Sequence, residues 1–375
     1  MVNRYTARML RVLHVSQPTE AGVARVVRHL VTDQLGAGLD VIAACPPTGP
    51  LPVDVAAAGA RVLAWPATRE PGPVSGHETL RLLRLVESVG ADVVHLHSAK
   101  AGLAGRLAVR GRKPTVYQPH AWSFWAATGW QRAGSLAWER FGARWTDQLV
   151  LVSEREREEA ARLRIPTEGV VVPNCVDVEW FAAQDDSARA EARAALGLDE
   201  APTVVCVGRL CRQKGQDLLL RAWPRVTAAV PDARLVLVGD GPDRARLAAG
   251  APPAVLLAGR ADDPRPWYAA ADVVVLPSRW EGQALVLLEA MASARSVVST
   301  DVGGAREALP ADGGAVVPVG DTEGLAAALV ARLHDPGLAT AEGAAGRGRA
   351  CAGHDVRRTT ARIRAIYQNV GRPGR

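Results

Sequence analysis

Residues 203–215 read TVVCVGRLCRQKG, and this stretch decides how the rest of the chain is interpreted. A run of β-branched and apolar residues ends at Gly208, and two cations, Arg209 and Lys214, follow it closely. Such a run is typical of a parallel strand that is buried on both faces, and ligands of parallel sheets bind at the carboxyl ends of the strands. A helical pattern begins near Gln216, so free amides lie close to the two cations. We predict an anion site here, with a diphosphate as its natural occupant. The alternative is that both cations are solvated loop charges.

The same pattern of apolar runs separated by helical segments recurs along the whole chain. Strands are predicted at 11–16, 41–45, 61–65, 92–97, 115–119, 148–152 and 170–173, and then at 203–207, 234–238, 255–257, 273–276, 296–299 and 315–317. Helical periodicity falls between them, for example at 23–35, 79–88, 100–110, 154–163, 217–230, 285–294 and 322–334. Two successive β/α series predict two facing, doubly wound, Rossmann-like α/β domains with a cleft between them. The expected domains are residues 1–178 and 179–355, and a C-terminal helix with a tail, 356–375, is expected to pack back toward the first domain.

Composition limits the classes of function that fit the chain. It has 375 residues, 48% hydrophobic and 22% charged, with a formal charge of +6 that comes mostly from arginine. This is ordinary for a globular protein, and we predict no nucleic-acid partner. No apolar run is long enough to span a bilayer and no signal-peptide pattern is present, so a cytoplasmic location is expected. The five cysteines are scattered, and neither a GxxxxGK[ST] nor a complete GxGxxG nor an HExxH motif occurs. We therefore expect no metal and no obligatory cofactor.

A second group of polar residues follows the predicted strand 273–276. Glu281 lies in the loop and Glu289 on the next helix, and carboxylates are good acceptors for sugar hydroxyls. Gly282 lets a ligand approach the backbone, and the amides that begin the helix would be free to bind phosphate. An equally weighted alternative is that Glu281 is solvated and that Glu289 caps a helix or pairs with an arginine.

The first half offers weaker candidates at the ends of its strands. His120 follows the strand 115–119 and could bind a ligand or carry a proton, although a lone histidine is more often structural. Gly22 lies between the first strand and its helix, where it could face a phosphate or simply begin the helix. His95 and His97 are interpreted as core residues or as supports for the site. Five tryptophans are clustered in this half, and we expect Trp138 and Trp145 to pack in the core. The better candidates for contact with an acceptor substrate are Trp122, Trp125 and Trp130.

Four segments together resemble one known family. VGRLCRQKG (207–215), VGDGP (238–242), VVVLPSRWEGQALVLLEAMA (273–292) and DVGGAREAL (301–309) are similar to the C-terminal domain of retaining family-4 glycosyltransferases with the GT-B fold. The resemblance implies catalytic roles for His120, Arg209, Lys214 and Glu281. It implies that the donor is bound by Gly22, Gly208, Arg209, Lys214, Arg260, Ser278, Glu281, Gly282, Gln283, Ala284, Leu285 and Glu289. In particular, the arginine and lysine bind the diphosphate, Glu281 the sugar and Glu289 the ribose.

Three positions depart from the family pattern. Ala21 precedes Gly22 where Gly-Gly is common, Cys175 replaces a glycine after Asn174, and Gln283 replaces an aromatic residue. The Cys175 substitution predicts a conformation that glycine adopts at lower cost.

The resemblance thus implies a retaining glycosyltransferase, and the lack of a metal-binding motif predicts that it is metal-independent. It would move a hexosyl or N-acetylhexosaminyl group from a nucleoside diphosphate sugar, with UDP favoured and GDP open. The acceptor would be a lipid-linked saccharide, met at the inner membrane surface, or a soluble metabolite. The alternatives are a nucleotide-sugar epimerase, a sugar phosphorylase, or a non-catalytic subunit that binds the sugar nucleotide.

Overall fold

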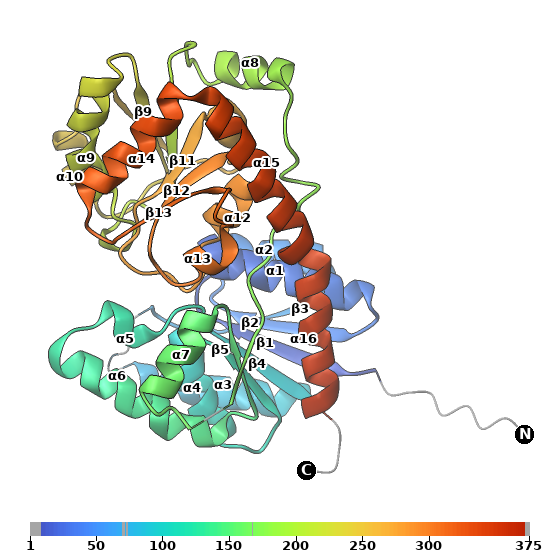
Figure 1. Cartoon of the computed structure of the whole chain (residues 1–375). Coiled ribbons are helices and arrows are strands. Elements are labelled where there is room, and N and C mark those ends of the chain that lie inside the picture. Colours follow the sequence, from blue (N-terminus) through green and yellow to red (C-terminus); the bar gives the residue numbers. More distant parts are fainter. Residues whose placement is uncertain (1–8, 70–71, 73, 167, 372–375) are drawn as a thin grey trace, which may run out of the picture. The chain divides into compact units, whose positions relative to one another are not determined.

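The computed structural model describes residues 9–69, 72, 74–166 and 168–371 (Figure 1). They form two compact units. Unit 1 contains the described residues up to Pro173 and those from Arg357 onward, and unit 2 is Asn174–Val356. The division falls five residues before the boundary expected from the sequence, because Val176 forms a parallel bridge with Asp355 and thereby joins unit 2.

Unit 1 is built on a parallel sheet. Its strands are β1 (Arg11–Ser16), β2 (Asp40–Cys45), β3 (Arg61–Ala64), β4 (Val93–His97), β5 (Thr115–Gln118), β6 (Gln148–Leu151) and β7 (Gly169–Val171). Their order is β3-β2-β1-β4-β5-β6-β7, so the winding direction reverses between β1 and β4. Loops that follow these two strands therefore lie at the switch point, where α/β sheets bind ligands.

Helices cover both faces of this sheet. They are α1 (Ala21–Gly36), α2 (Pro50–Ala57), α3 (Ser75–Val89), α4 (Ser98–Val109), α5 (Ser123–Ala126), α6 (Gly129–Gly142), the 3-10 turn η1 (Ala143–Trp145), α7 (Glu154–Arg162) and α16 (Val356–Val370). The buried side chains of α3 and α4 pack with one face of the sheet, and those of α1 and α2 form a second core. Near-continuous burial along β1, β2 and β4 explains why these strands are apolar runs rather than alternating ones.

Unit 2 repeats the plan. Its strands are β8 (Thr203–Val207), β9 (Arg234–Val238), β10 (Val255–Gly259), β11 (Val273–Leu276), β12 (Ser296–Thr300) and β13 (Gly314–Val317), in the order β10-β9-β8-β11-β12-β13. All pairs are parallel, and β8 meets β11 with Val204 opposite Val273. The switch point of this sheet thus lies between β8 and β11, the two strands whose following loops carry the motifs described above.

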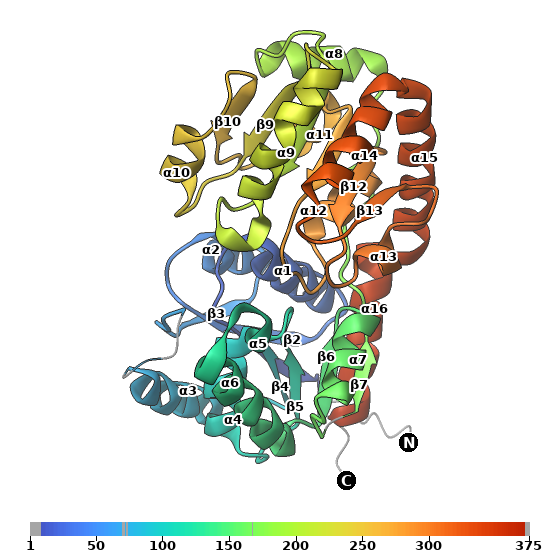
Figure 2. The same cartoon turned by 60° about the vertical axis from the view of Figure 1, so that its left-hand side comes forward.

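The helices of unit 2 complete its core (Figure 2). They are α8 (Asp186–Ala195), the 3-10 turn η2 (Arg212–Lys214), α9 (Gln216–Ala229), α10 (Arg244–Ala249), α11 (Arg265–Ala270), α12 (Leu285–Ala292), α13 (Ala305–Ala308), α14 (Thr322–His334) and α15 (Pro336–Gly353). Helices α9 and α14 lie side by side over one face of the sheet, and Trp223 and Leu329 are buried in the same cluster.

Candidate functional site

The loop after β8 is held against the loop after β11 by a position that only glycine can occupy. Gly215 has a φ of +67°, and a Cβ there would lie 2.0 Å from the carbonyl oxygen of Pro277. A side chain would therefore push the two loops apart. Gly215 also begins α9, so the turn η2 and the first amides of α9 are fixed beside the end of β11.

Lys214 and Glu281 meet at this junction. The Nζ of Lys214 lies 2.6 Å from Oε1 of Glu281, and the same carboxylate oxygen accepts a hydrogen bond of 2.9 Å from Oγ of Ser278. The amide of Gln213 donates to Oε2 at 3.3 Å. Burial disfavours the charged form of Lys214, but the Glu281 carboxylate outweighs it and raises the pKa of the ammonium. The ammonium is therefore charged at neutral pH, and the alternative that Glu281 is simply solvated is wrong, because its exposed fraction is 7%.

Arg209 differs from Lys214 in its surroundings. It follows Gly208 at the end of β8, and its side chain is exposed. Its carbonyl accepts a hydrogen bond from Gln216, but its guanidinium has no hydrogen-bond or ion-pair partner among the residues that the structure describes. The structure thus brings to one strand end a paired ammonium and an unpaired guanidinium.

The N-terminus of α12 adds backbone donors to the same loops. The helix begins at Leu285, its N-cap is Ala284, and no side chain caps it. The preceding Gln283 is engaged elsewhere: its Oε1 accepts from the backbone amide of Asn174 at 2.7 Å, and its carbonyl accepts from Nδ2 of Asn174 at 2.8 Å. The Gln283 side chain is therefore a structural link to the segment that opens unit 2. Its backbone amide remains a candidate for donor binding.

The second glutamate and Arg260 have distinct environments. Glu289 lies within α12 with 2% of its surface exposed, and its Oε2 accepts a hydrogen bond of 2.7 Å from the hydroxyl of Tyr268. Sequence reasoning missed Tyr268, because it lies on α11 outside every motif. Arg260 follows the edge strand β10, which β9 separates from β8. Its side chain is 56% exposed, and its Nε lies 3.6 Å from Oδ1 of Asp262.

In unit 1 the backbone is strained at the carboxyl ends of three strands. Ala21, Ser98 and His120 are not glycines, yet their φ angles are +60°, +77° and +61°. They follow β1, β4 and β5, which are adjacent in the sheet. Gly22 lies in the first turn of α1 next to Ala21, so the alanine that departs from the family pattern takes the left-handed conformation. Cys175 has no such angle, so the predicted cost of that substitution is wrong.

His120 is the outermost member of a row of histidines. Its Nε2 lies 3.1 Å from Nδ1 of His97, whose Nε2 lies 2.9 Å from Nδ1 of His14. Burial lowers the pKa of His14 to about 4 and lowers those of His97 and His120 as well. All three imidazoles are therefore neutral near pH 7. His95 and His97 are completely buried, in agreement with a supporting position.

The burial of the clustered tryptophans differs from the sequence prediction. Trp122 is 1% exposed, and its Nε1 donates to the carbonyl of Glu156 at 3.0 Å. It is a core residue, so its assignment as an acceptor contact is wrong. Trp125 is half-buried against the same core, whereas Trp130 is 82% exposed on α6. Trp138 and Trp145 are half-buried rather than enclosed in the core.

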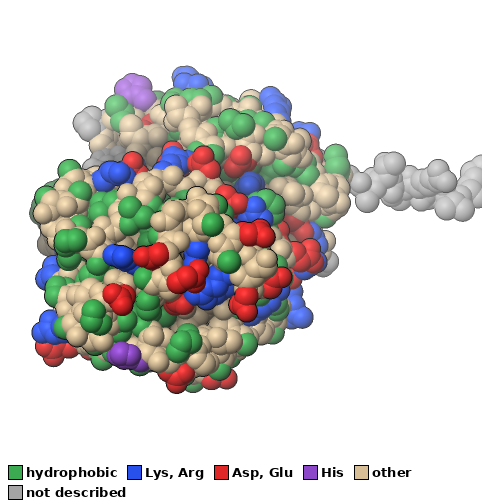
Figure 3. Space-filling view, turned by 90° about the horizontal axis from the view of Figure 1, so that it is seen from above, with side chains coloured by type: hydrophobic (Ala, Val, Ile, Leu, Met, Phe, Trp, Pro, Cys, Tyr) green, Lys and Arg blue, Asp and Glu red, His purple; other side chains and the backbone are tan. Residues whose placement is uncertain are grey.

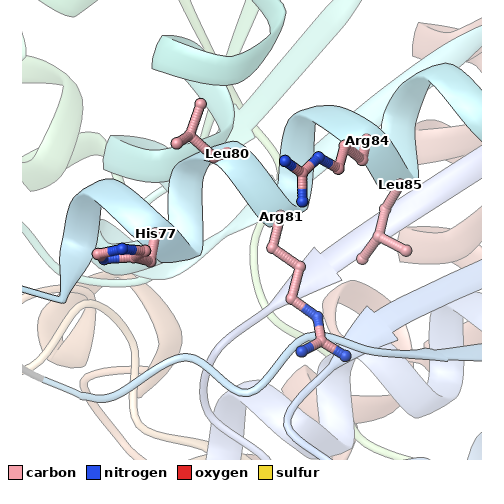
Figure 4. Close-up of a pocket in the computed structure, with 5 residues that line it drawn as sticks. All are labelled: His77, Leu80, Arg81, Arg84 and Leu85. Carbon is pink, nitrogen blue, oxygen red and sulfur yellow. The ribbon is translucent and has the colours of Figure 1, made fainter.

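Other surface features do not coincide with these strand ends. A depression on α3 is lined by His77, Leu80, Arg81, Arg84 and Leu85, none of which is a predicted site residue (Figure 4). On the face in Figure 3, basic and acidic side chains are intermingled over the described atoms. No helix in the described ranges is sufficiently long and apolar to cross a bilayer.

Comparisons with known proteins identify the family to which the chain is similar. The family model "Glycosyltransferase Family 4" matches residues 21–180, and "Glycosyl transferases group 1" matches residues 201–335. A GDP-mannose-dependent monoacylated α-(1-6)-phosphatidylinositol monomannoside mannosyltransferase of Corynebacterium glutamicum is 37% identical over 189 residues, which are 47% of this chain and half of that relative. A GDP-mannose-dependent α-(1-6)-phosphatidylinositol monomannoside mannosyltransferase of Mycolicibacterium smegmatis is 34% identical over 319 residues, 78% of this chain and 80% of that relative.

The fold is also shared with solved structures. Sucrose-phosphate synthase of Thermosynechococcus elongatus superposes with a TM-score of 0.82 at 22% identity, covering 96% of this chain and 99% of the other. The two domain matches and the relative aligned over most of the chain show that this protein belongs to the family-4 glycosyltransferases with the GT-B fold.

Proposed function

We propose that unit 2 binds the diphosphate of a nucleoside diphosphate sugar and that the enzyme transfers the sugar with retention of configuration. The observation that carries this proposal is the grouping of Lys214, Arg209 and the uncapped N-terminus of α12 at one switch point. An ammonium, a guanidinium and free amides together complement a diphosphate far better than any one of them.

These groups would act most strongly as the leaving group departs. Negative charge on the diphosphate grows as the glycosidic bond breaks, and preorganised cations that face it stabilise the transition state more than the bound donor. Arg209 has no competing partner within the described residues, so it is free to bind the phosphates. Lys214 would keep Glu281 on one side and contact phosphate on the other. No carboxylate base is required, because the departing phosphate oxygen can take the proton of an acceptor that attacks from the same face.

The carboxylates would recognise the remaining parts of the donor. Glu281, held by Lys214 and Ser278, would accept from hydroxyls of the sugar. Glu289, oriented by Tyr268, would accept from the ribose. His120 would contact the donor sugar as a neutral imidazole, the role that the family resemblance implies. Arg260 is a weaker candidate, because it lies at the edge strand.

The donor that we now propose is GDP-mannose. The expectation of a UDP-sugar came from its frequency in the family, whereas two relatives more than 30% identical are GDP-mannose-dependent by name. Both of these relatives act on phosphatidylinositol mannosides, which favours a glycolipid or another lipid-linked saccharide as acceptor over a soluble metabolite. The exposed Trp130 on α6 suits contact with a membrane surface. We place the reaction at the cytoplasmic side of a membrane.

A donor panel tests this proposal. Release of nucleoside diphosphate is measured with GDP-mannose, UDP-glucose and UDP-N-acetylglucosamine, each with a polyprenyl-linked saccharide, a phosphatidylinositol glycolipid or a soluble glycoside. We expect turnover with GDP-mannose and a lipid acceptor, and Arg209→Ala should lower it by about 100-fold or more. Arg212→Ala, which removes an exposed cation from the same loop, is the control. Normal turnover by Arg209→Ala would refute the diphosphate site.

A further inference from the structure

The histidine row that ends at His120 continues into the interior of unit 1. The Nε2 of His14 lies 2.8 Å from Oε1 of Gln34 on α1. The Nε2 of Gln34 donates to the hydroxyl of Tyr367 on α16 at 3.4 Å, and that hydroxyl lies 2.6 Å from Nδ1 of His95. An ion pair between Arg364 and Asp33 fixes α16 against α1 one turn away. One hydrogen-bonded chain thus links the C-terminal helix to the carboxyl end of β5.

The chemistry of Gln34 assigns every proton along this chain. Its amide oxygen can only accept, so His14 donates from Nε2, and the Nδ1 of a neutral His14 is then an acceptor. His97 must therefore donate from Nε2 and accept at Nδ1. By the same rule His120 donates from Nε2 to His97. The remaining nitrogen of His120, Nδ1, carries a lone pair and has no hydrogen-bond partner among the described residues.

We propose that Gln34 and Tyr367 are positioning residues which, through His14 and His97, fix the tautomer in which His120 presents an acceptor at Nδ1. This deepens the proposed function and rests on it, because a hydroxyl of the donor sugar would be the group that donates to Nδ1. In this arrangement the Tyr367 hydroxyl accepts from the amino group of Gln34, which leaves the hydroxyl proton for Nδ1 of His95. Without that contact the amide could turn over and reverse every proton in the row.

A bound metal is the competing interpretation of these side chains. The ligand atoms of His14, His95 and His97 lie within 4.8 Å of one another. However, both nitrogens of His14 and both of His97 are already at hydrogen-bonding distance from a partner. Lone pairs used in this way cannot also converge on an ion, so the hydrogen-bonded chain accounts for the cluster.

Tautomers can be read directly from ¹⁵N NMR of protein labelled in histidine, with peaks assigned by single His→Gln variants. We expect His14, His95, His97 and His120 to be neutral and protonated at Nε2 near pH 7. His354 is an internal reference for the opposite tautomer, because its Nδ1 faces the carbonyl of Asn174 at 3.1 Å and must carry the proton. An Nδ1–H form of His120, or stoichiometric metal in the purified protein that is lost in His14→Gln, would overturn the proposal.

Two variants test the coupling. Gln34→Met should mix the two tautomers of His120 and lower kcat/KM by about three- to tenfold, the equivalent of one neutral hydrogen bond. In a His120→Asn background the same change should cost less than about twofold, because its effect acts through His120. If Gln34→Met alone leaves both the tautomer and kcat/KM unchanged, Gln34 is not a positioning residue.

Tyr367→Phe removes a single oxygen and so keeps the proposal testable should Gln34→Met fail to fold. It should also mix the His120 tautomers. The matched control is Tyr117→Phe, which removes a buried hydroxyl of the same unit that donates to Glu139 and is not part of the chain. If Tyr367→Phe and Tyr117→Phe give the same ¹⁵N signals for His120, the coupling between Tyr367 and the His120 tautomer is refuted. The NMR measurement needs no donor, so its outcome is separate from that of Arg209→Ala, on which the proposed function depends.

Discussion

Removing the Lys214 ammonium tests whether its charge serves folding or catalysis. In Lys214→Met, Glu281 loses its ion-pair partner at 2.6 Å but keeps the hydrogen bonds from Ser278 and Gln213. Breaking a fully buried pair costs about 3–5 kcal/mol. The lysine side chain is 23% exposed and two donors remain, so we expect a loss of about 2 kcal/mol in the free energy of unfolding.

The expected effect on catalysis is larger and has a different origin. Loss of one preorganised donor at a developing charge lowers kcat by about 100- to 1,000-fold, or about 2.7–4 kcal/mol of transition-state stabilisation. The double variant Lys214→Met/Glu281→Gln separates the two effects. Because the double variant has no unpaired carboxylate, it should regain most of the free energy of unfolding that Lys214→Met loses. It still lacks the cation, so its kcat should stay low.

Urea unfolding and steady-state release of nucleoside diphosphate at saturating donor measure the two quantities on the same preparations. Arg212→Ala is the matched control, because its guanidinium lies on the same turn and only stacks 5.6 Å from Trp280. Its turnover should stay within about twofold of wild type. A double variant that recovers turnover to within about tenfold would refute the assignment, because the lysine would then matter only as the partner of Glu281.

Three further predictions concern pH, backbone strain and metal. The buried imidazoles of His14, His95, His97 and His120 have lowered pKa values, so the unfolded chain binds more protons below pH 6.5 and the free energy of unfolding must decrease as the pH falls. Four protons amount to at most about 5 kcal/mol per pH unit, and urea midpoints from pH 7 to 5 should reveal a slope that shrinks in His97→Gln. Ala21→Gly should raise the free energy of unfolding by up to about 1 kcal/mol, because it relieves a left-handed alanine, and an unchanged or lower urea midpoint would contradict this. Turnover should persist after dialysis against EDTA, and loss of activity restored by a divalent cation would show that the transferase needs a metal.

The strands could be predicted closely because local sequence decides them. In both units, runs of valine and leucine buried on both faces gave bounds within one or two residues, as at β8 and β11. The boundary between the units could not be found in this way. It depends on the bridge between Val176 and Asp355, a contact between residues that are far apart in the chain.

The candidate site was predictable to the extent that its residues follow strands. Lys214 and Glu281 were assigned from their positions in two motifs, and the ion pair between them is a consequence of the sheet order that places β8 beside β11. Trp122 was misassigned because its hydrogen-bond partner, the carbonyl of Glu156, lies far along the chain. Tyr268 and Gln34 were missed for the same reason, since each contacts its functional partner only through tertiary packing.

The two units use different means to shape their strand ends. In unit 2 the loops at the switch point depend on glycine, as at Gly215, which takes a left-handed angle at little cost. In unit 1 non-glycine residues take such angles after β1, β4 and β5, at roughly 1–2 kcal/mol each.

The other non-glycine residues with positive φ in the described ranges are Arg110, Arg164 and Ala294. All three lie just beyond helix C-termini, where this conformation is an ordinary cap. Within the described residues, positive φ angles of non-glycine residues without a capping role thus occur only beyond the carboxyl ends of three adjacent strands of unit 1. Such strain persists only where surrounding structure enforces it, and the buried histidine chain beneath His120 is a structure of that kind. On our proposal, the same histidine chain that surrounds the strained backbone of His120 also fixes the proton position on its ring.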